Sequence, residues 1–355
     1  MSNFHAVRVS DIIRETPDCV SIGFGIPKNL AKEFEYKAGQ HVIVRKILGD
    51  EDVRRTYSFC SAPSSGHRRI AVRHVEGGAF STFANTKLKV GDTLEISTPI
   101  GEFTLPTDAR TSSNYVAFAV GSGITPIMAM IREVLTREPN SHFFLYYGNR
   151  DAEHTIFAEQ LAHMKNLHME RFSYQFFMTR QVVDIPFFNG RITGDKASIL
   201  HQNVFSKINI DEYYLCGPLS MIDGVREALV NAGETAENIH SELFFAGADS
   251  ERANKRSALD GLAKSKVTVI SDGRKIEVDY RDEHGSILEA TLKSGIDVSF
   301  ACKGGVCATC RAKVTEGKVD MALNYGLEPE EIEAGFVLTC QSIPLTKTVT
   351  ISFDE

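Results

Sequence analysis

The sequence has no tryptophan, no long apolar run and no excess of positive charge. Its longest apolar stretches, such as Tyr115–Val120, are far shorter than the ~20 residues that a membrane-spanning helix requires. The formal net charge of −7 leaves no basic face for nucleic-acid phosphates or an anionic membrane. The first ten residues contain no charged segment followed by an apolar one, so no signal peptide is expected. We therefore expect a cytoplasmic protein with no nucleic acid and no membrane among its partners.

Disulfide bonds are also not expected, because seven cysteines is an odd number in a long chain without a secretory signal. Cys19 and Cys60 stand apart from the other cysteines, and we interpret both as structural residues. Four cysteines lie together near the C-terminus: Cys302, Cys307, Cys310 and Cys340.

The C-terminal cysteines have the spacing of a plant-type [2Fe–2S] site, C-x4-C-x2-C followed by a single cysteine after 29 intervening residues. Three thiolates then come from one loop, in which Gly304 and Gly305 allow the backbone to pass close to the inorganic sulfides. A zinc site is one alternative, but structural zinc usually takes two cysteine pairs, and Cys340 stands alone. Buried unligated cysteines are another, although three on a glycine-rich loop would pack poorly. The sequence predicts that the four cysteines ligate an iron–sulfur cluster.

At 355 residues the chain is long enough for two or three domains. Residues 1–108 contain short alternating segments between turn residues, which predicts an antiparallel β-barrel. In residues 109–245 apolar strands alternate with helices, which predicts a parallel α/β sheet. Residues 246–265 are expected to be a linker, and residues 266–355 open with a hairpin signal at Asp272-Gly273. The expected strands are 19–26, 41–47, 69–75, 93–98, 115–120, 142–147, 172–178, 212–215 and 240–245, and the expected helices are 126–136, 156–164 and 219–231.

Two short motifs in the β-rich region suit a flavin. Arg55-Thr56-Tyr57-Ser58 offers a guanidinium for a phosphate, an aromatic face for the flavin ring and a hydroxyl for the ring edge near N5. About 20 residues later, Gly77 and Gly78 permit a tight turn, and Phe80–Ala84 suits a first helical turn whose N–H groups and Ser81 hydroxyl hold a pyrophosphate. Each motif alone occurs by chance on ordinary strands and turns. The two in this order favour a flavin site.

Three features of the α/β region suit a nicotinamide nucleotide. Gly121–Pro126 follows a strand and opens a helix, with Thr125 inside the motif and Pro126 suited to a first helical position. A plain strand–turn–helix joint is the alternative, since a third glycine is missing. Cys216-Gly217-Pro218 follows a later strand, at the end where ligands of parallel sheets bind. Arg150 comes after Asn149 at the end of another strand and can pair with a 2′-phosphate, which favours NADPH over NADH, although Asp151 would repel that phosphate and a solvated arginine is the alternative.

With these motifs together, the chain resembles the ferredoxin–NADP reductase family with a plant-type ferredoxin domain fused at its C-terminus. ACKGGVCATC, Asn324-Tyr325, Leu327–Pro329 and Tyr147–Arg150 are most similar to the reductase components of oxygenases, among them those of phenylacetyl-CoA epoxygenase and 3-ketosteroid 9α-hydroxylase. The resemblance covers the whole chain except the linker. It implies FAD rather than FMN, a β-grasp fold for the last domain, and a partner oxygenase.

The resemblance also implies roles for individual residues. The catalytic residues would be Ser58, Cys216 near the hydride-donating carbon, and Glu242 near the nicotinamide, for which a surface carboxylate is the alternative. The flavin would be contacted by Arg55, Tyr57, Ser58, Arg73, His74, Val75, Gly78, Phe80 and Ser81, with Arg73–Val75 on the next strand. The nicotinamide nucleotide would be contacted by Gly123, Thr125, Pro126, Asn149, Arg150, Cys216, Gly217, Pro218 and Met221.

The expected activity is electron transfer from NADPH, or NADH, through FAD and the [2Fe–2S] cluster to an oxygenase. Residues 266–355 carry 10 Lys and Arg against 15 Asp and Glu, so the acidic excess is concentrated in the cluster domain and can steer a basic partner. A reductase of another oxygenase, hydroxylase or lipid desaturase is an alternative. A non-catalytic electron carrier or redox sensor is a third interpretation.

Overall fold

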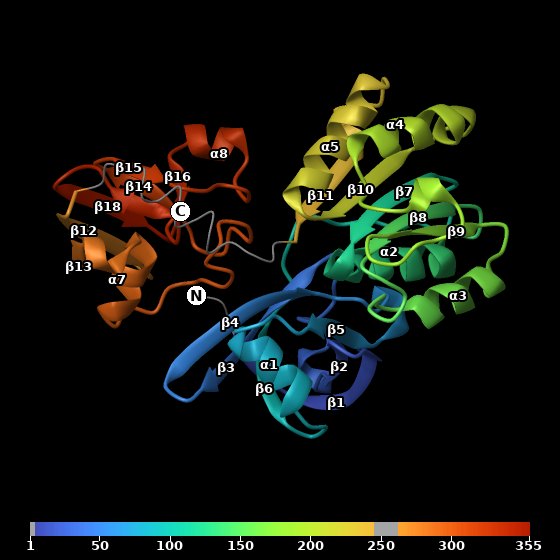
Figure 1. Ribbon diagram of the computed structural model, residues 1–355. Coiled ribbons are helices and arrows are strands. Elements are labelled where there is room, and N and C mark those ends of the chain that lie inside the picture. Colours follow the sequence, from blue (N-terminus) through green and yellow to red (C-terminus); the bar gives the residue numbers. More distant parts are fainter. Residues whose placement is uncertain (1–3, 245–261) are drawn as a thin grey trace. The chain divides into compact units, whose positions relative to one another are not determined.

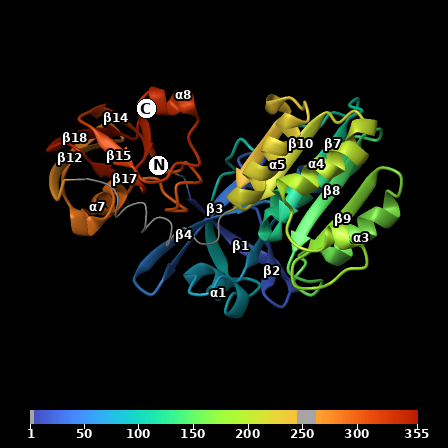
Figure 2. The ribbon, with the colours of Figure 1, turned by 45° about the horizontal axis from the view of Figure 1, so that its top comes forward.

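The computed structural model describes residues 4–244 and 262–355, whose strands and helices follow the chain in three successive groups (Figures 1 and 2). The described chain forms two compact units. One comprises Phe4–Val53 and Tyr57–Phe244, and the other is centred on residues 262–355. Most of the expected linker, residues 246–261, lies outside the described residues. Among the described residues, no helix is both long and apolar enough to cross a membrane.

The first group is an antiparallel barrel with the strand order β4-β3-β6-β1-β2-β5. A bridge between Phe59 and Ile70 joins the end of β4 to β5 and closes it. The sequence alone does not single out β1, because polar residues interrupt its alternation and the pairing with β2 shifts register twice. The elements are β1 (Phe4–Thr16), β2 (Cys19–Gly25), β3 (His41–Leu48), β4 (Glu51–Ser58), β5 (Arg68–Arg73), α1 (Ala79–Thr86) and β6 (Thr93–Ser97).

The second group is a five-stranded parallel sheet with the order β11-β10-β7-β8-β9. Helices α2 and α3 cover one face, and α4 and α5 cover the other (Figure 1). Helix α4 was not expected, because its sequence GDKASILHQN has a weak apolar stripe. The elements are β7 (Asn114–Val120), α2 (Ile124–Arg137), β8 (His142–Asn149), α3 (Ala158–Leu167), β9 (Phe172–Met178), α4 (Gly194–Asn203), β10 (Glu212–Gly217), α5 (Leu219–Asn231) and β11 (Ile239–Leu243).

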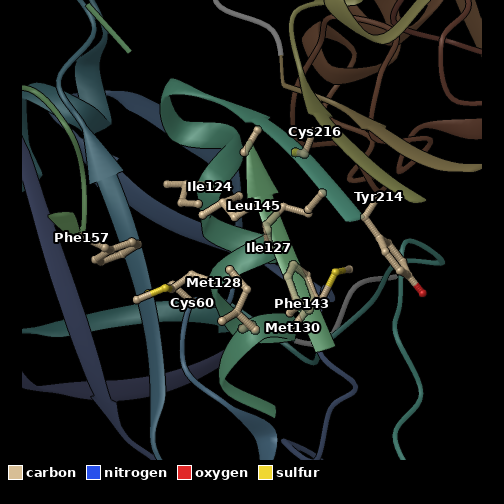
Figure 3. Packing of buried hydrophobic residues seen from close by; sticks show 14 of the residues in the cluster. Cys60, Ile124, Ile127, Met128, Met130, Phe143, Leu145, Phe157, Tyr214 and Cys216 are labelled. Atoms are coloured by element: carbon tan, nitrogen blue, oxygen red, sulfur yellow. The ribbon is translucent and has the colours of Figure 1, made fainter. Parts of the chain in front are cut away.

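Helix α2 lies at the centre of a core that the barrel and the sheet share. Ile124, Ile127 and Met130 are fully buried in one cluster with Leu145 of the sheet and Cys60 of the barrel (Figure 3). Because no water-filled layer separates the two groups here, their relative placement is fixed by packing. This shared core is what allows residues of the barrel and the sheet to form one site.

The third group is a mixed sheet with the order β13-β12-β18-β14-β16, on which α7 packs, as in a β-grasp fold. The hairpin prediction is confirmed: Asp272 and Gly273 both have positive φ, 51° and 70°, as a two-residue type I′ turn requires. Strand β12 begins at Lys264, so it includes the last two residues of the expected linker. The elements are β12 (Lys264–Ser271), β13 (Arg274–Arg281), α7 (Ile287–Lys293), β14 (Arg311–Glu316), β15 (Val319–Met321), α8 (Pro329–Glu333), β16 (Phe336–Leu338), β17 (Ser342–Pro344) and β18 (Thr348–Ser352).

Candidate functional site

The glycine turn after β7 leads directly into α2. Gly121–Gly123 form one turn of 3-10 helix, and Gly121 has a positive φ of 56°, which glycine adopts without strain. The Thr125 hydroxyl donates to the carbonyl of Ser122 at 3.1 Å and ties the first turn of α2 to the loop. Pro126 is the third residue of α2, not the first as expected, because the 3-10 turn starts the helix earlier. Its missing N–H still falls where no intrahelical acceptor exists.

Gly123 lies against the end of β10 so closely that no side chain fits. A Cβ at this position would come within 2.3 Å of the carbonyl oxygen of Cys216 and 3.1 Å of the backbone nitrogen of Gly217. Both are backbone atoms, which cannot rotate away. The glycine turn and the Cys216-Gly217-Pro218 segment are therefore one packed unit at the carboxyl edge of the sheet, where ligands of such sheets bind.

We expect Gly123→Ala to weaken nucleotide binding at least ~10-fold and to lower stability by about 1–3 kcal/mol, because the added methyl must separate the two segments. Binding of 2′,5′-ADP by titration calorimetry and thermal unfolding would measure both. Gly25→Ala is the matched control, since its Cβ would meet nothing closer than 3.6 Å. Unchanged binding in Gly123→Ala would mean that the nucleotide does not use this turn.

Cys216 is a neutral thiol inside the site. Burial raises the pKa of the fully buried Cys216 thiol well above its ordinary value, and the Glu242 carboxylate raises it further. The residue can therefore pack against a ligand ring but is not a thiolate nucleophile at neutral pH. Pro218 directly precedes the first residue of α5. The buried Met221 lies against Gly217, because a Cβ on Gly217 would be 2.8 Å from the methyl carbon of Met221.

Glu242 joins the barrel to the sheet. It pairs in register with Cys216 on the neighbouring strand β10, and its carboxylate accepts a hydrogen bond from the Ser58 hydroxyl at 3.4 Å. Its other oxygen lies 3.6 Å from Nδ1 of His41. Glu242 is only partly exposed, so it is not a plain surface carboxylate. The three predicted catalytic residues Ser58, Cys216 and Glu242 thus lie together, although they come from three different strands.

His41 is a site residue that the sequence did not reveal. Nothing in its sequence context distinguishes it from the chain's other histidines. Its ring packs on Gly101, which has a positive φ of 117° and whose Cβ would come within 2.9 Å of the imidazole Nδ1. The sequence feature that relates to His41 is Gly101, where a side chain would displace the imidazole ring. This relation becomes visible once the fold is known.

The structure brings the two flavin motifs together. Tyr57 of β4 lies against Phe80 of α1, with ring centroids 5.6 Å apart. Gly78 precedes α1, and the backbone N–H groups of the first three helix residues have no acceptor among the described residues. These N–H groups and the helix dipole suit a pyrophosphate. The Ser81 hydroxyl is instead used locally, since it bonds the backbone of Val75 and Gly78 and closes the turn before the helix.

Arg73 is the last residue of β5, so His74 and Val75 lie beyond the strand on which they were expected. The strand ends there because the chain turns: the backbone N–H of His74 donates to the carbonyl of Asp18 at 2.7 Å. His74 then lies 3.3 Å from the Thr82 hydroxyl of α1, and Val75 is exposed. The Arg73 guanidinium reaches the glycine turn, because a Cβ on Gly121 would be 3.3 Å from its Nη1.

Asn149 and Arg150 stand at the carboxyl end of β8, as expected. Asn149 is buried, whereas the Arg150 side chain is 45% exposed. The Asp151 carboxylate bonds its own neighbour, with Oδ1 2.7 Å from Nδ1 of His154, and the positive charges of His154 and Arg150 help to lower its pKa. Arg55 of the first motif donates to the carbonyl of its neighbour Arg54.

The four C-terminal thiols form two pairs. The Cys307 thiol donates to the sulfur of Cys302, which lowers the pKa of Cys302 to about 5, and the thiols of Cys310 and Cys340 pair in the same way. In the part of the chain that the structure describes, none of the four forms a disulfide bond. Within the described residues, no three His, Cys, Asp or Glu side chains form a site for a single metal ion. Two pairs of thiols suit two iron atoms better than one zinc ion.

Backbone and side-chain donors surround the sulfurs. The N–H groups of Gly304 and Cys307 point at the Cys302 sulfur at 3.3 and 3.4 Å, and the Thr309 hydroxyl donates to the Cys307 sulfur at 3.1 Å. Gly305 has a positive φ of 78° and packs against the carbonyl of Leu323. Such donors stabilise thiolates that carry the charge of a cluster. The donor set therefore fits a [2Fe–2S] cluster.

The arrangement of the barrel and sheet likewise fits FAD and a nicotinamide nucleotide. The N–H groups that open α1 and the aromatic pair of Tyr57 and Phe80 suit the flavin. Arg73, which the resemblance assigns to the flavin, reaches the glycine turn instead, so we assign it to the nucleotide. Its Nη2 atom is buried and has no hydrogen-bond partner among the described residues, as expected of a guanidinium that binds an anion.

Comparison with known proteins agrees with this division. Residues 6–105 match the oxidoreductase FAD-binding domain family, residues 118–227 the oxidoreductase NAD-binding domain family, and residues 269–345 the 2Fe-2S iron-sulfur cluster binding domain family. One component of the 1,2-phenylacetyl-CoA epoxidase of Escherichia coli K12 is 38% identical, over 100% of this chain and 99% of that one. The chain belongs to the ferredoxin–NADP reductase family with a fused [2Fe–2S] domain.

Another family member, the ferredoxin reductase component of 3-ketosteroid-9-alpha-monooxygenase from Rhodococcus rhodochrous, is 30% identical over 97% of this chain and 95% of its own length. The fold matches the solved structure of phthalate dioxygenase reductase, with a TM-score of 0.65 over 99% of this chain and 98% of that one, at 22% identity. As a family member, this protein is a nicotinamide-dependent oxidoreductase that uses FAD and a [2Fe–2S] cluster. The expected fold classes of its three parts are confirmed.

Proposed function

We propose that this reductase supplies electrons from NADPH to the oxygenase component of an epoxidase that acts on the coenzyme A thioester of phenylacetate. The 38% identity over the full length with the Escherichia coli epoxidase component is the observation that carries this proposal. The match includes the [2Fe–2S] domain, from which a partner oxygenase would receive electrons. The proposal keeps the cytoplasmic location expected from the sequence.

The bound cofactors supply the redox chemistry: FAD accepts a hydride, which is two electrons and a proton, and the cluster carries electrons one at a time. The residues of the chain bind these cofactors and orient them. The opening N–H groups of α1 would hold the FAD pyrophosphate, and Tyr57, which packs against Phe80, would offer its aromatic face to the flavin ring. The glycine turn, Arg73 and Arg150 hold the phosphates of the nucleotide. The neutral Cys216 thiol packs beside the nicotinamide and leaves no nucleophile to attack it.

Ser58 and Glu242 handle the proton in this proposal. Each NADPH that reduces one-electron acceptors releases one proton, which must leave a site where Ser58 is 2% exposed. The Ser58 hydroxyl donates to the Glu242 carboxylate, so the two groups form a hydrogen-bonded path from the buried barrel strand to a residue with some solvent access.

Reconstitution tests the choice of partner. Purified reductase mixed with the oxygenase subunits of the phenylacetyl-CoA epoxidase is expected to support NADPH-dependent consumption of phenylacetyl-CoA. The same reductase with the oxygenase component of a 3-ketosteroid hydroxylase is the control and is expected to be at least ~10-fold slower, because complementary charge selects the docking partner. Equal rates with both, or a faster steroid reaction, would overturn the assignment. Steady reduction of cytochrome c by NADPH separates a reductase from a non-catalytic sensor.

A further inference from the structure

Asp18 lies in the two-residue turn between β1 and β2, far in the sequence from every motif that suggested a cofactor. Its position is fixed on two sides. The Thr16 hydroxyl donates to Asp18 Oδ1 at 2.8 Å, and the carbonyl of Asp18 accepts the N–H of His74 at 2.7 Å. A carboxylate held in this way cannot follow its partners when they move.

Two arginines meet at one oxygen of this carboxylate. Arg73 donates Nε to Asp18 Oδ2 at 2.9 Å, and Nη2 of Arg150 lies 3.9 Å from the same oxygen. Burial alone would raise the pKa of Asp18, but the hydrogen bonds from Thr16 and Arg73 outweigh it and lower the pKa, so Asp18 is charged at neutral pH. His154 also faces Asp18 and adds positive potential there, and the buried Cys19 thiol is a further titratable neighbour.

The contact with Arg73 directs that side chain towards the glycine turn. Because Nε is bound to Asp18, the two terminal nitrogens point the other way: Nη1 lies against Gly121, and Nη2 is buried with no hydrogen-bond partner in residues 4–244 and 262–355. In this arrangement the two terminal nitrogens of the guanidinium can bind a diphosphate. Asp18 therefore positions Arg73.

The contact with Arg150 has the opposite consequence. Arg150 is the residue to which we assign the 2′-phosphate of NADPH, and Asp18 is a carboxylate within ion-pair distance of its guanidinium. Asp151 bonds His154 and also attracts Arg150 electrostatically. A 2′-phosphate that binds Arg150 must share this arginine with Asp18 or displace the Asp18 carboxylate from it. The fixed carboxylate also repels the negative charge of the 2′-phosphate. NADH has no such group and does not meet this opposition.

We propose that Asp18 sets the discrimination between NADPH and NADH. It positions Arg73 for the diphosphate that both nucleotides carry, and it weakens the attraction of Arg150 for the 2′-phosphate that only NADPH carries. The inference rests on the proposed nicotinamide site. It identifies a specificity-determining residue on the flavin barrel, outside the α/β sheet that carries the glycine turn.

The test measures binding of 2′,5′-ADP and of 5′-AMP to the full chain by titration calorimetry. Asp18→Asn keeps an oxygen for Arg73 but removes the charge, so 2′,5′-ADP should bind about 10-fold more tightly while 5′-AMP changes less than about 2-fold. The ratio of kcat/KM for NADPH to that for NADH should rise by the same factor through KM, with kcat unchanged. Asp18→Ala also removes the hydrogen-bond acceptor for Arg73 and should weaken the binding of 5′-AMP.

Asp11→Asn is the matched control, because it removes another barrel carboxylate, one that pairs with Arg69, and it should reproduce none of the gain. In the double variant Asp18→Asn with Arg150→Ala, the gain for 2′,5′-ADP should vanish. An equal change for both ligands in Asp18→Asn, or no change, overturns the role of Asp18 and leaves the nucleotide site standing. If neither ligand binds the unaltered protein, the proposed nicotinamide site fails and the inference fails with it.

Discussion

Cys302→Ala is expected to abolish NADPH-dependent reduction of cytochrome c, by at least ~100-fold, and to spare reduction of ferricyanide by the flavin. The Cys302 sulfur accepts hydrogen bonds from two backbone N–H groups and pairs with Cys307. Loss of this sulfur would therefore remove one of the two thiolates that bind one iron. Electrons that reach the flavin then have no cluster to enter, whereas a small dye can accept them directly. Steady-state assays with the two acceptors and the iron content of the purified protein measure this.

Cys60→Ser is the matched control for that experiment. Cys60 is a buried barrel residue whose sulfur donates to the carbonyl of Arg69, a bond that a hydroxyl can keep. The control should retain iron and both activities. If Cys302→Ala lost the two activities equally, the order flavin before cluster would be wrong. If it kept both iron and cytochrome c reduction, Cys302 would not be a ligand.

Ser58→Ala is expected to slow reduction of the flavin by NADPH about 100-fold, with little change in the nucleotide affinity. The hydroxyl is buried and donates to Glu242, so its removal breaks the only hydrogen bond that the described structure gives this side chain at the site. Stopped-flow absorbance under anaerobic conditions measures the rate, and Glu242→Gln, which keeps an acceptor oxygen, should be affected less than Glu242→Ala.

Ser97→Ala separates a local effect from general destabilisation of the barrel. Ser97 is equally buried in the same barrel, and its hydroxyl bonds the backbone of Ile43 and Thr98 away from the site. It should lower stability without slowing hydride transfer. A normal rate of flavin reduction in Ser58→Ala would show that Ser58 is not catalytic. A slow rate together with a reduced flavin content would also count against that role, because the loss of flavin would explain the slow rate.

Much of the architecture could be predicted from local patterns. The spacing of the four cysteines is a local pattern with few physical solutions, and the alternation of strands and helices predicts a parallel sheet because no other layer arrangement buries their faces. The Asp272-Gly273 turn was predictable because both residues tolerate positive φ. Helix α4 and strand β1 escaped prediction because a weak apolar stripe and two register shifts hide their periodicity.

The site divides in the same way. The sequence by itself predicted the four cysteines as cluster ligands, the glycine turn and the paired flavin motifs, because each is a short segment whose backbone and side chains act together. The tertiary structure alone decided that Glu242 meets Ser58 and His41, and that Asp18 lies within ion-pair distance of Arg150. Hydrogen bonds and charges act over a few ångströms regardless of sequence separation, so only the folded chain shows which groups lie within that range.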